Sequence, residues 1–115
     1  MILAIVDDLM FSSKIKTTAN HLGVAVTFAR SAEAALKAMR TSAPALTIID
    51  LDSARTDPLG TVAAIKSDPA LASIPIIGFV SHVHADLIDS ARAAGVDVMA
   101  RSAFTAQLAT ILQRA

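Results

Sequence analysis

Four carboxylates follow two of the most apolar runs in the sequence, and their placement favours chemistry on phosphate. Asp7 and Asp8 come directly after an apolar run at the start of the chain, and Asp50 and Asp52 close another in its middle. Carboxylates held within a few ångströms repel one another unless a cation or a shared proton compensates. Mg²⁺ is the simplest compensating cation, because it prefers oxygen ligands and is typically held by one or two carboxylates plus a phosphate oxygen. If the two pairs meet, the pattern predicts a magnesium site made for phosphoryl transfer.

Individual residues at these positions could have distinct roles. Asp50 is the candidate nucleophile, able to form an acyl phosphate, because it ends the predicted central strand. Ser81 ends the predicted neighbouring strand, where its hydroxyl could donate to a phosphoryl oxygen. Simpler roles stay open, with Asp8 capping the first helix and Ser81 capping a later one. We interpret the side chains of Asp52 and Asp57, in a polar loop, as solvated turn residues rather than ligands.

Five short apolar runs recur along the chain and alternate with segments of helical spacing. Most of these runs are unalternated, as in strands of a parallel sheet that is covered on both faces. Gly23 and Gly95 each stand where a helix should hand over to a strand. Ser31 is placed to cap the second helix. The predicted strands are 2–6, 24–28, 45–49, 74–80 and 96–100, and the last predicted helix carries Phe104, Leu108, Ile111 and Leu112.

This (βα)5 pattern predicts an α/β fold of the flavodoxin-like kind, a three-layer sandwich with a parallel sheet in the order 2-1-3-4-5. In that order the winding reverses between strands 1 and 3, which opens a crevice at their carboxyl ends. The acidic residues at those ends should therefore converge. The length of 115 residues predicts one domain, residues 1–115.

Charge and composition exclude several classes of function. Ten basic residues balance ten acidic ones, so the chain lacks the electrostatic footprint of a nucleic-acid or anionic-membrane binder. Charged residues interrupt every apolar run well before the roughly 18 residues that a membrane span requires. The absence of cysteine excludes disulfides and thiolate metal sites and fits a reducing cytosol. We therefore expect a cytoplasmic protein whose partners are proteins or small ions.

The sequence resembles, over essentially its whole length, the receiver domain of bacterial two-component response regulators. The matching pieces are the acidic pair in AIVDD, the Asp in PALTIID, the strand-end hydroxyl in IIGFVS and the AGVDV entry to the last strand. The resemblance implies that Asp7 and Asp8 hold Mg²⁺ and that Asp50 is the phosphoacceptor. It also implies that Ser81 bonds the phosphoryl group and that the backbone carbonyl of Asp52 completes the metal coordination.

The same resemblance implies the partners of the domain. The phosphoryl donor would be a phosphohistidine on a sensor histidine kinase or a phosphotransfer protein, in a two-component phosphorelay. The domain would be a phosphoacceptor and not an enzyme. Its output would reach a downstream protein, or a second copy of the chain, through the last two helices and the fifth strand, residues 81–115.

Several positions depart from the family pattern. Most receivers end the fifth strand with Lys-Pro-Phe, and here the aligned triplet begins with Ser102, which carries no charge and could simply cap the last helix. Arg101 is adjacent, but one step along a strand turns a side chain to the opposite face, unless a slipped register or a bulge intervenes. Met99 stands at the aromatic switch position. His82 is bulkier than the small residue that usually follows the hydroxyl.

Two alternatives follow from these departures and from the Asp50-Leu51-Asp52 motif. The first is a pseudo-receiver that acts by phosphorylation-independent protein contacts, because a switch requires contacts that differ between its two states. The second, more remote, is a phosphohydrolase of the haloacid dehalogenase type, whose opening motif this triplet resembles. Against it, the motif lies in mid-chain, Ala54 stands where a Thr is expected, and Lys66 is the only lysine that follows.

Overall fold

The computed structural model describes residues 1–81 and 84–114, and over this part of the chain strands and helices alternate. The strands are β1 (Ile2–Ile5), β2 (Val26–Ala29), β3 (Leu46–Asp50), β4 (Ile76–Val80) and β5 (Asp97–Ala100). The helices are α1 (Leu9–Leu22), α2 (Ala32–Thr41), α3 (Pro58–Ser67), α4 (Ala85–Ala93), α5 (Arg101–Ala106) and α6 (Leu108–Leu112), with a short 3-10 helix η1 (Ala54–Thr56) before α3.

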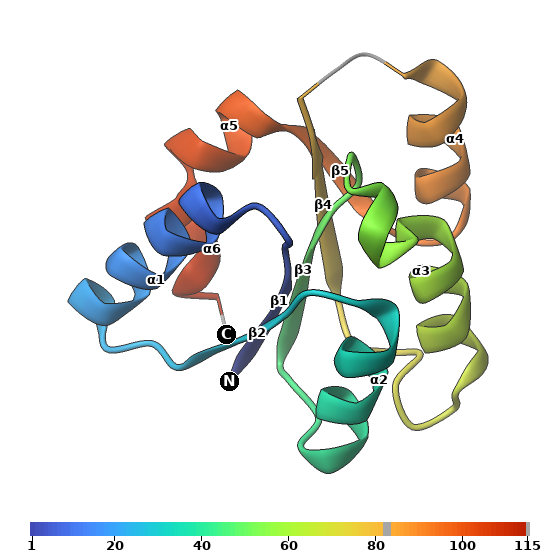
Figure 1. Ribbon diagram of the computed structural model, residues 1–115, viewed down its shortest axis with the longest axis horizontal. Helices are drawn as coiled ribbons and strands as arrows, with labels where there is room; N and C mark the ends of the chain where they lie inside the picture. The colour runs from blue at the N-terminus through green and yellow to red at the C-terminus, as the bar shows by residue number, and fades with distance from the viewer. Residues whose placement is uncertain (82–83, 115) are drawn as a thin grey trace.

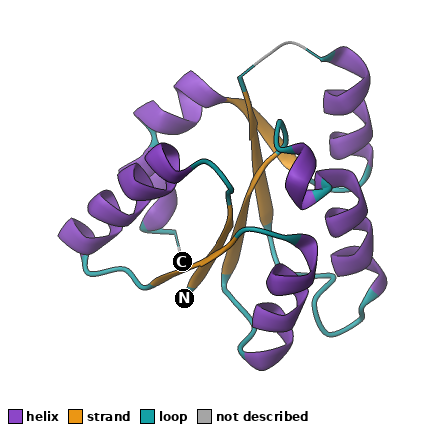
Figure 2. Ribbon diagram, in the orientation of Figure 1, coloured by secondary structure: helices purple, strands orange, loops and turns teal. Residues whose placement is uncertain are grey.

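The sheet has the order β2-β1-β3-β4-β5, and every neighbouring pair is parallel. Helices α1, α5 and α6 cover one face, while α2, α3 and α4 cover the other (Figures 1 and 2). The predicted flavodoxin-like sandwich and its strand order are therefore confirmed. In register, Ile5 lies beside Ile49 and Asp50 beside Phe79, so β1, β3 and β4 end at a common edge.

Both faces of the central strands are buried, which explains their unbroken apolar sequences. Alternate residues enter different cores: Ala4 and Ile48 pack on the α1 and α6 side, whereas Ile5 and Ile49 pack on the side of α2 and α3. All residues of β1, β3 and β4 are buried. A strand covered on both sides shows no polar alternation, because neither of its faces meets water.

Local signals set most of the helix ends. Ser31 accepts a hydrogen bond from the N–H of Ala34 and caps α2, and Gly23 ends α1 in the left-handed region at φ 69°. The prediction of one continuous last helix was wrong, since the chain leaves helical geometry at Gln107 and α5 and α6 are separate. Their four apolar residues are nevertheless buried, because apolar spacing reports burial and not the hydrogen bonding at a single residue.

No helix in residues 1–81 and 84–114 has both the length and the apolar character that crossing a bilayer requires.

The space around Gly78 in β4 yields a test of this packing. A Cβ at this position would lie 2.8 Å from Leu51 Cδ1 and 2.8 Å from Val96 Cγ1. We expect Gly78→Ala to lower the free energy of unfolding by about 1 to 3 kcal/mol, as overpacking of a filled core does. Urea unfolding followed by circular dichroism measures the change. Unchanged stability would contradict the close packing of β4 against Leu51 and Val96.

Candidate functional site

Asp50 is the buried acid of the site. It ends β3 with only 5% of its surface exposed, and its Oδ1 accepts a hydrogen bond of 2.9 Å from the backbone N–H of Asp52. Burial raises the pKa of Asp50 above the ordinary value of 3.8, against the opposite influence of the Asp52 N–H. Asp50 thus occupies the place predicted for a nucleophile, in an environment that opposes its ionisation.

Asp8 is held from two directions at the neighbouring strand end. Its Oδ1 accepts hydrogen bonds from the N–H groups of Met10 (2.9 Å) and Phe11 (3.2 Å), which confirms the expected cap of α1. Its Oδ2 accepts a hydrogen bond of 3.0 Å from Nη2 of Arg101. The bond from the Phe11 N–H, followed by that from Arg101, lowers the pKa of Asp8 below 3.8. Asp8 is therefore a firmly ionised carboxylate with a donor on each oxygen.

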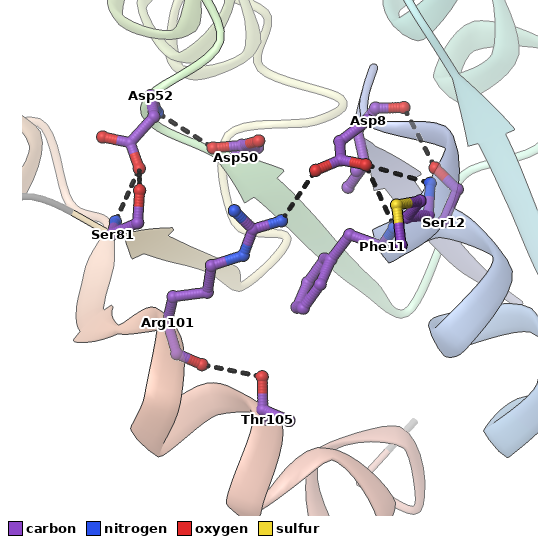
Figure 3. A network of polar contacts seen from close by, with 10 residues as sticks. Asp8, Phe11, Ser12, Asp50, Asp52, Ser81, Arg101 and Thr105 are labelled. Carbon is purple, nitrogen blue, oxygen red and sulfur yellow. Dashed lines mark hydrogen bonds and ion pairs between the residues drawn. The ribbon is translucent and has the colours of Figure 1, made fainter.

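Asp7, Asp8, Asp50 and Asp52 lie at the carboxyl ends of β1 and β3 and form the acidic edge of the sheet. Arg101 reaches this acidic edge, contrary to the expectation that it would face away. No register slip is involved, because β4 and β5 pair regularly up to Val80 and Ala100. The strand ends at Ala100 and Arg101 is the first residue of α5, so strand alternation no longer applies. Figure 3 shows the side chain extending from α5 toward Asp8 and Asp50. A cation thus stands at the site, although it comes from residue 101 and not from the aligned position 102.

Three phenylalanines form the apolar floor beneath this cation. The guanidinium carbon of Arg101 lies 4.3 Å from the ring centroid of Phe11, a cation–π arrangement. The Phe11 ring lies 4.8 Å from that of Phe79 and 5.9 Å from that of Phe104, and the last two stack at 4.8 Å. Since Phe79 lies beside Asp50 in the sheet, the core and the site share this cluster.

Asp52 and Ser81 form a second connection, which corrects the interpretation of the Asp52 side chain as a solvated turn residue. Oδ2 of Asp52 accepts hydrogen bonds from both the backbone N–H and the hydroxyl of Ser81, the latter at 2.6 Å. Ser81 does not cap α4, which begins at Ala85. The carboxylate therefore ties the loop after β3 to the end of β4 (Figure 3).

Asp7 does not join the other carboxylates. Its Oδ1 lies 3.1 Å from Nε of Arg30, and its Oδ2 lies 3.6 Å from Nε of Arg55. Both oxygens of Asp8 also have donors. Over the described ranges, no three His or carboxylate residues are grouped so as to hold a metal ion. The set Asp7, Asp8 and Asp50 expected for Mg²⁺ is thus not assembled in this arrangement, although the two strand ends do meet.

The remaining predicted positions lie at the rim. Met99 is half-buried against the core cluster on the α1 side of the sheet. Ser102 is exposed as the second residue of α5 and does not cap it; Ala100 holds the N-cap position. His82 lies outside the described residues.

Sequence reasoning missed the contact of Arg101 with Asp8 and the side-chain role of Asp52. The predicted strand boundary at residue 100 was the available signal for Arg101, since a residue beyond a strand need not follow its alternation. For Asp52 the sequence signal was weaker, because the type of a polar loop residue does not indicate which group it will bond.

Comparison with known proteins found similar proteins among the solved structures, and the three described here are response regulators. Neither the scan of protein-family models nor the search of curated proteins found a match. Among solved structures, the phosphorylated cyanobacterial phytochrome response regulator RcpA is 26% identical, with a TM-score of 0.82 over 98% of this chain and 88% of RcpA. The Mn²⁺-bound response regulator Rcp1 is 18% identical, with a TM-score of 0.81 over 96% of this chain and 89% of Rcp1. The chemotaxis response regulator CheY4 of Vibrio cholerae is 18% identical, with a TM-score of 0.84 over 98% of this chain and 95% of CheY4.

The burial of Asp50 predicts a pH-dependent effect on stability. A carboxyl whose folded pKa lies above 3.8 stabilises the fold fully only below 3.8 and loses this contribution as the pH rises through the raised value. At pH 7 we expect Asp50→Asn to increase the free energy of unfolding by about 1 kcal/mol, the size common for stabilising substitutions. The gain should shrink as the pH falls through the pKa of Asp50.

Urea unfolding of the wild type and of Asp50→Asn in a chelating buffer, from pH 7 down through the pKa of Asp50, measures the effect. Equal or lower stability of Asp50→Asn at pH 7 would contradict a net unfavourable burial of the Asp50 charge.

Proposed function

We propose that this chain, which has the fold of response-regulator receiver domains, is a signal-transduction domain that accepts a phosphoryl group on Asp50. The observation that carries the proposal is the position of Asp50, buried at the end of the central strand and subject to the charge of Arg101. A phosphohistidine of a sensor histidine kinase or phosphotransfer protein is the proposed donor. The relay would operate in the cytoplasm.

The transfer requires few groups from the protein. A carboxylate oxygen of Asp50 attacks phosphorus, a new O–P bond forms, and the P–N bond to the donor histidine breaks. With a small donor such as acetyl phosphate, the P–O bond breaks instead and acetate leaves. Arg101 supplies positive charge close to the transferring group, where fixed charges are most effective. The protein would end each cycle carrying one phosphoryl group, as an acceptor and not as a turnover enzyme.

We include a divalent cation as a candidate only and assign no step of the transfer to it. The Mn²⁺-bound Rcp1 structure supports such an ion for this fold, and Mg²⁺ is the ion we propose, with Asp7, Asp8, Asp50 and the carbonyl of Asp52 as candidate ligands. In the observed arrangement these groups do not fit an ion, because Asp7 and Asp8 are already paired with arginines. The positive charge at the site is therefore assigned to Arg101.

The phosphohydrolase alternative receives no support from the geometry. Lys66, the only lysine after the acidic motif, donates from Nζ to the carbonyl of Ala72. Ala72 precedes β4, so this contact lies at the amino-terminal edge of the sheet, opposite to Asp50. The output surface we propose comprises α4, β5 and α5, which lie beside the site and would contact a protein partner or a second copy.

Reaction with a small donor tests the proposal. After incubation with acetyl phosphate, with and without Mg²⁺, the intact mass of the wild-type chain should increase by one phosphoryl group, and hydroxylamine should remove it. Asp50→Asn should stay unmodified. Asp57→Asn is the matched control, because Asp57 is an exposed cap of α3 that Asn can replace, and it should react like the wild type. Modification of Asp50→Asn, or none of the wild type under any condition, would reject Asp50 as the acceptor.

One observation favours a second candidate function, a phosphorylation-independent interaction domain. Asp52 already accepts hydrogen bonds from the backbone N–H and the hydroxyl of Ser81. This hydroxyl is the group expected to bond a phosphoryl oxygen. A domain in which this bond is permanent has one state to present to a partner, with no second state to select.

The Asp52→Ala variant distinguishes the two functions. Loss of the charged hydrogen bonds should cost about 1 to 3 kcal/mol of unfolding free energy. In ¹⁵N NMR spectra with beryllofluoride, we expect the Ser81 amide to shift more in Asp52→Ala than in the wild type, because its donors are released. Ser53→Ala, a change in the same loop, should behave like the wild type. An equally large Ser81 shift in the wild type would contradict the second candidate.

A further inference from the structure

The acidic edge contains a cation that belongs to the chain itself. The guanidinium of Arg101 bonds Oδ2 of Asp8 at 3.0 Å, and Oδ1 of Asp8 is occupied by the N–H groups of Met10 and Phe11. Oδ1 thus accepts two hydrogen bonds, whereas Oδ2 accepts one and keeps one acceptor position. A metal ion that binds Oδ2 lies beside the guanidinium of Arg101, and two cations that share one carboxylate oxygen repel each other.

Of the two sets of donors, Arg101 is the one that can leave. The N–H bonds to Oδ1 are part of the start of α1, and breaking them would uncap the helix. The Arg101 side chain is 30% exposed, and its contact with Asp8 involves side-chain atoms alone. Displacing it costs the ion pair and the contact with the Phe11 ring, and leaves the backbone intact.

We infer that Arg101 is the resident cation of this site, competing with a divalent metal ion for Asp8 and supplying the positive charge for a phosphoryl group on Asp50. This inference rests on the proposed function for its second part only. The competition for Asp8 follows from the contacts themselves.

The surroundings hold Arg101 in this place. Its backbone starts α5, and its carbonyl accepts the hydroxyl hydrogen bond of Thr105 at 2.8 Å, which fixes the first turn of that helix. Its guanidinium lies over Phe11, and Phe11 is braced by Phe79 and Phe104. A planar guanidinium can stack on a ring and bond a carboxylate together, which an ammonium group does less well.

The charges at Asp50 agree with this role. Asp8 and Arg101 act on Asp50 with opposite sign, so the guanidinium offsets the neighbouring carboxylate. Without Arg101, two carboxylates would face each other uncompensated, the condition that favours capture of a metal ion. Removing the arginine charge should therefore increase affinity for a divalent ion.

Titration with Mn²⁺ alone, followed by isothermal calorimetry or by electron paramagnetic resonance of free Mn²⁺, tests the competition. We expect Arg101→Gln to bind Mn²⁺ about tenfold tighter than the wild type, within the usual range of coupling between two sites. Arg101→Lys, which restores a charge, should return the affinity toward the wild-type value. Arg40→Gln is the matched control, because it removes an equal charge at the end of α2, where Arg40 pairs with Asp68, and should leave Mn²⁺ binding unchanged.

The outcomes separate this inference from the proposed function. Equal Mn²⁺ affinity of wild type and Arg101→Gln, both shown folded by circular dichroism, would overturn the competition, whether or not Asp50 accepts a phosphoryl group. Tighter binding by Arg101→Gln supports it even if acetyl phosphate fails to modify the chain. Tighter binding that Arg101→Lys does not reverse would also overturn it, since the effect would then not depend on charge.

Discussion

The ion pair between Asp8 and Arg101 is the contact on which the organisation of this site depends. It joins residues 93 positions apart, one beside the end of the first strand and the other just after the end of the fifth. An exposed ion pair of this kind contributes little to overall stability. Its importance is local, because it places a positive charge between carboxylates that the sheet topology brings together. Without it, the repulsion between Asp8 and Asp50 would lack the opposing charge of Arg101.

The structure distributes the charges of this edge among separate partners. Three of the four carboxylates bond groups outside the cluster: Asp7 to Arg30 and Arg55, Asp8 to Arg101, and Asp52 to Ser81. Asp50 is different, because it is buried, accepts a hydrogen bond from the Asp52 N–H and has a raised pKa. This difference supports the proposal that Asp50 is the phosphoacceptor, whereas the other three carboxylates each bond a partner of their own.

The fold was predictable from sequence because its signals are local and repeated. Unalternated apolar runs indicate strands that are buried on both faces. Ser31 indicates the start of a helix, and Gly23 indicates the end of one. The convergence of Asp8 and Asp50 followed from strand order alone. The direction of individual side chains did not, because it depends on where an element ends to within one residue and on partners far away in the chain. Arg101 shows this: the strand was placed correctly up to residue 100, yet its alternation was carried one residue too far.

Asp8 and Asp50 are neighbouring carboxyl groups in opposite electrostatic environments. The most direct measurement is a titration of the side-chain carboxyl ¹³C resonances of Asp8 and Asp50 by NMR in metal-free buffer. We expect the pKa of Asp8 to lie below 3.8, because helix N–H groups and Arg101 stabilise its anion, and the pKa of Asp50 to lie above 3.8, because Asp50 is buried. An Asp50 that titrates at or below the pKa of Asp8 would contradict this expectation.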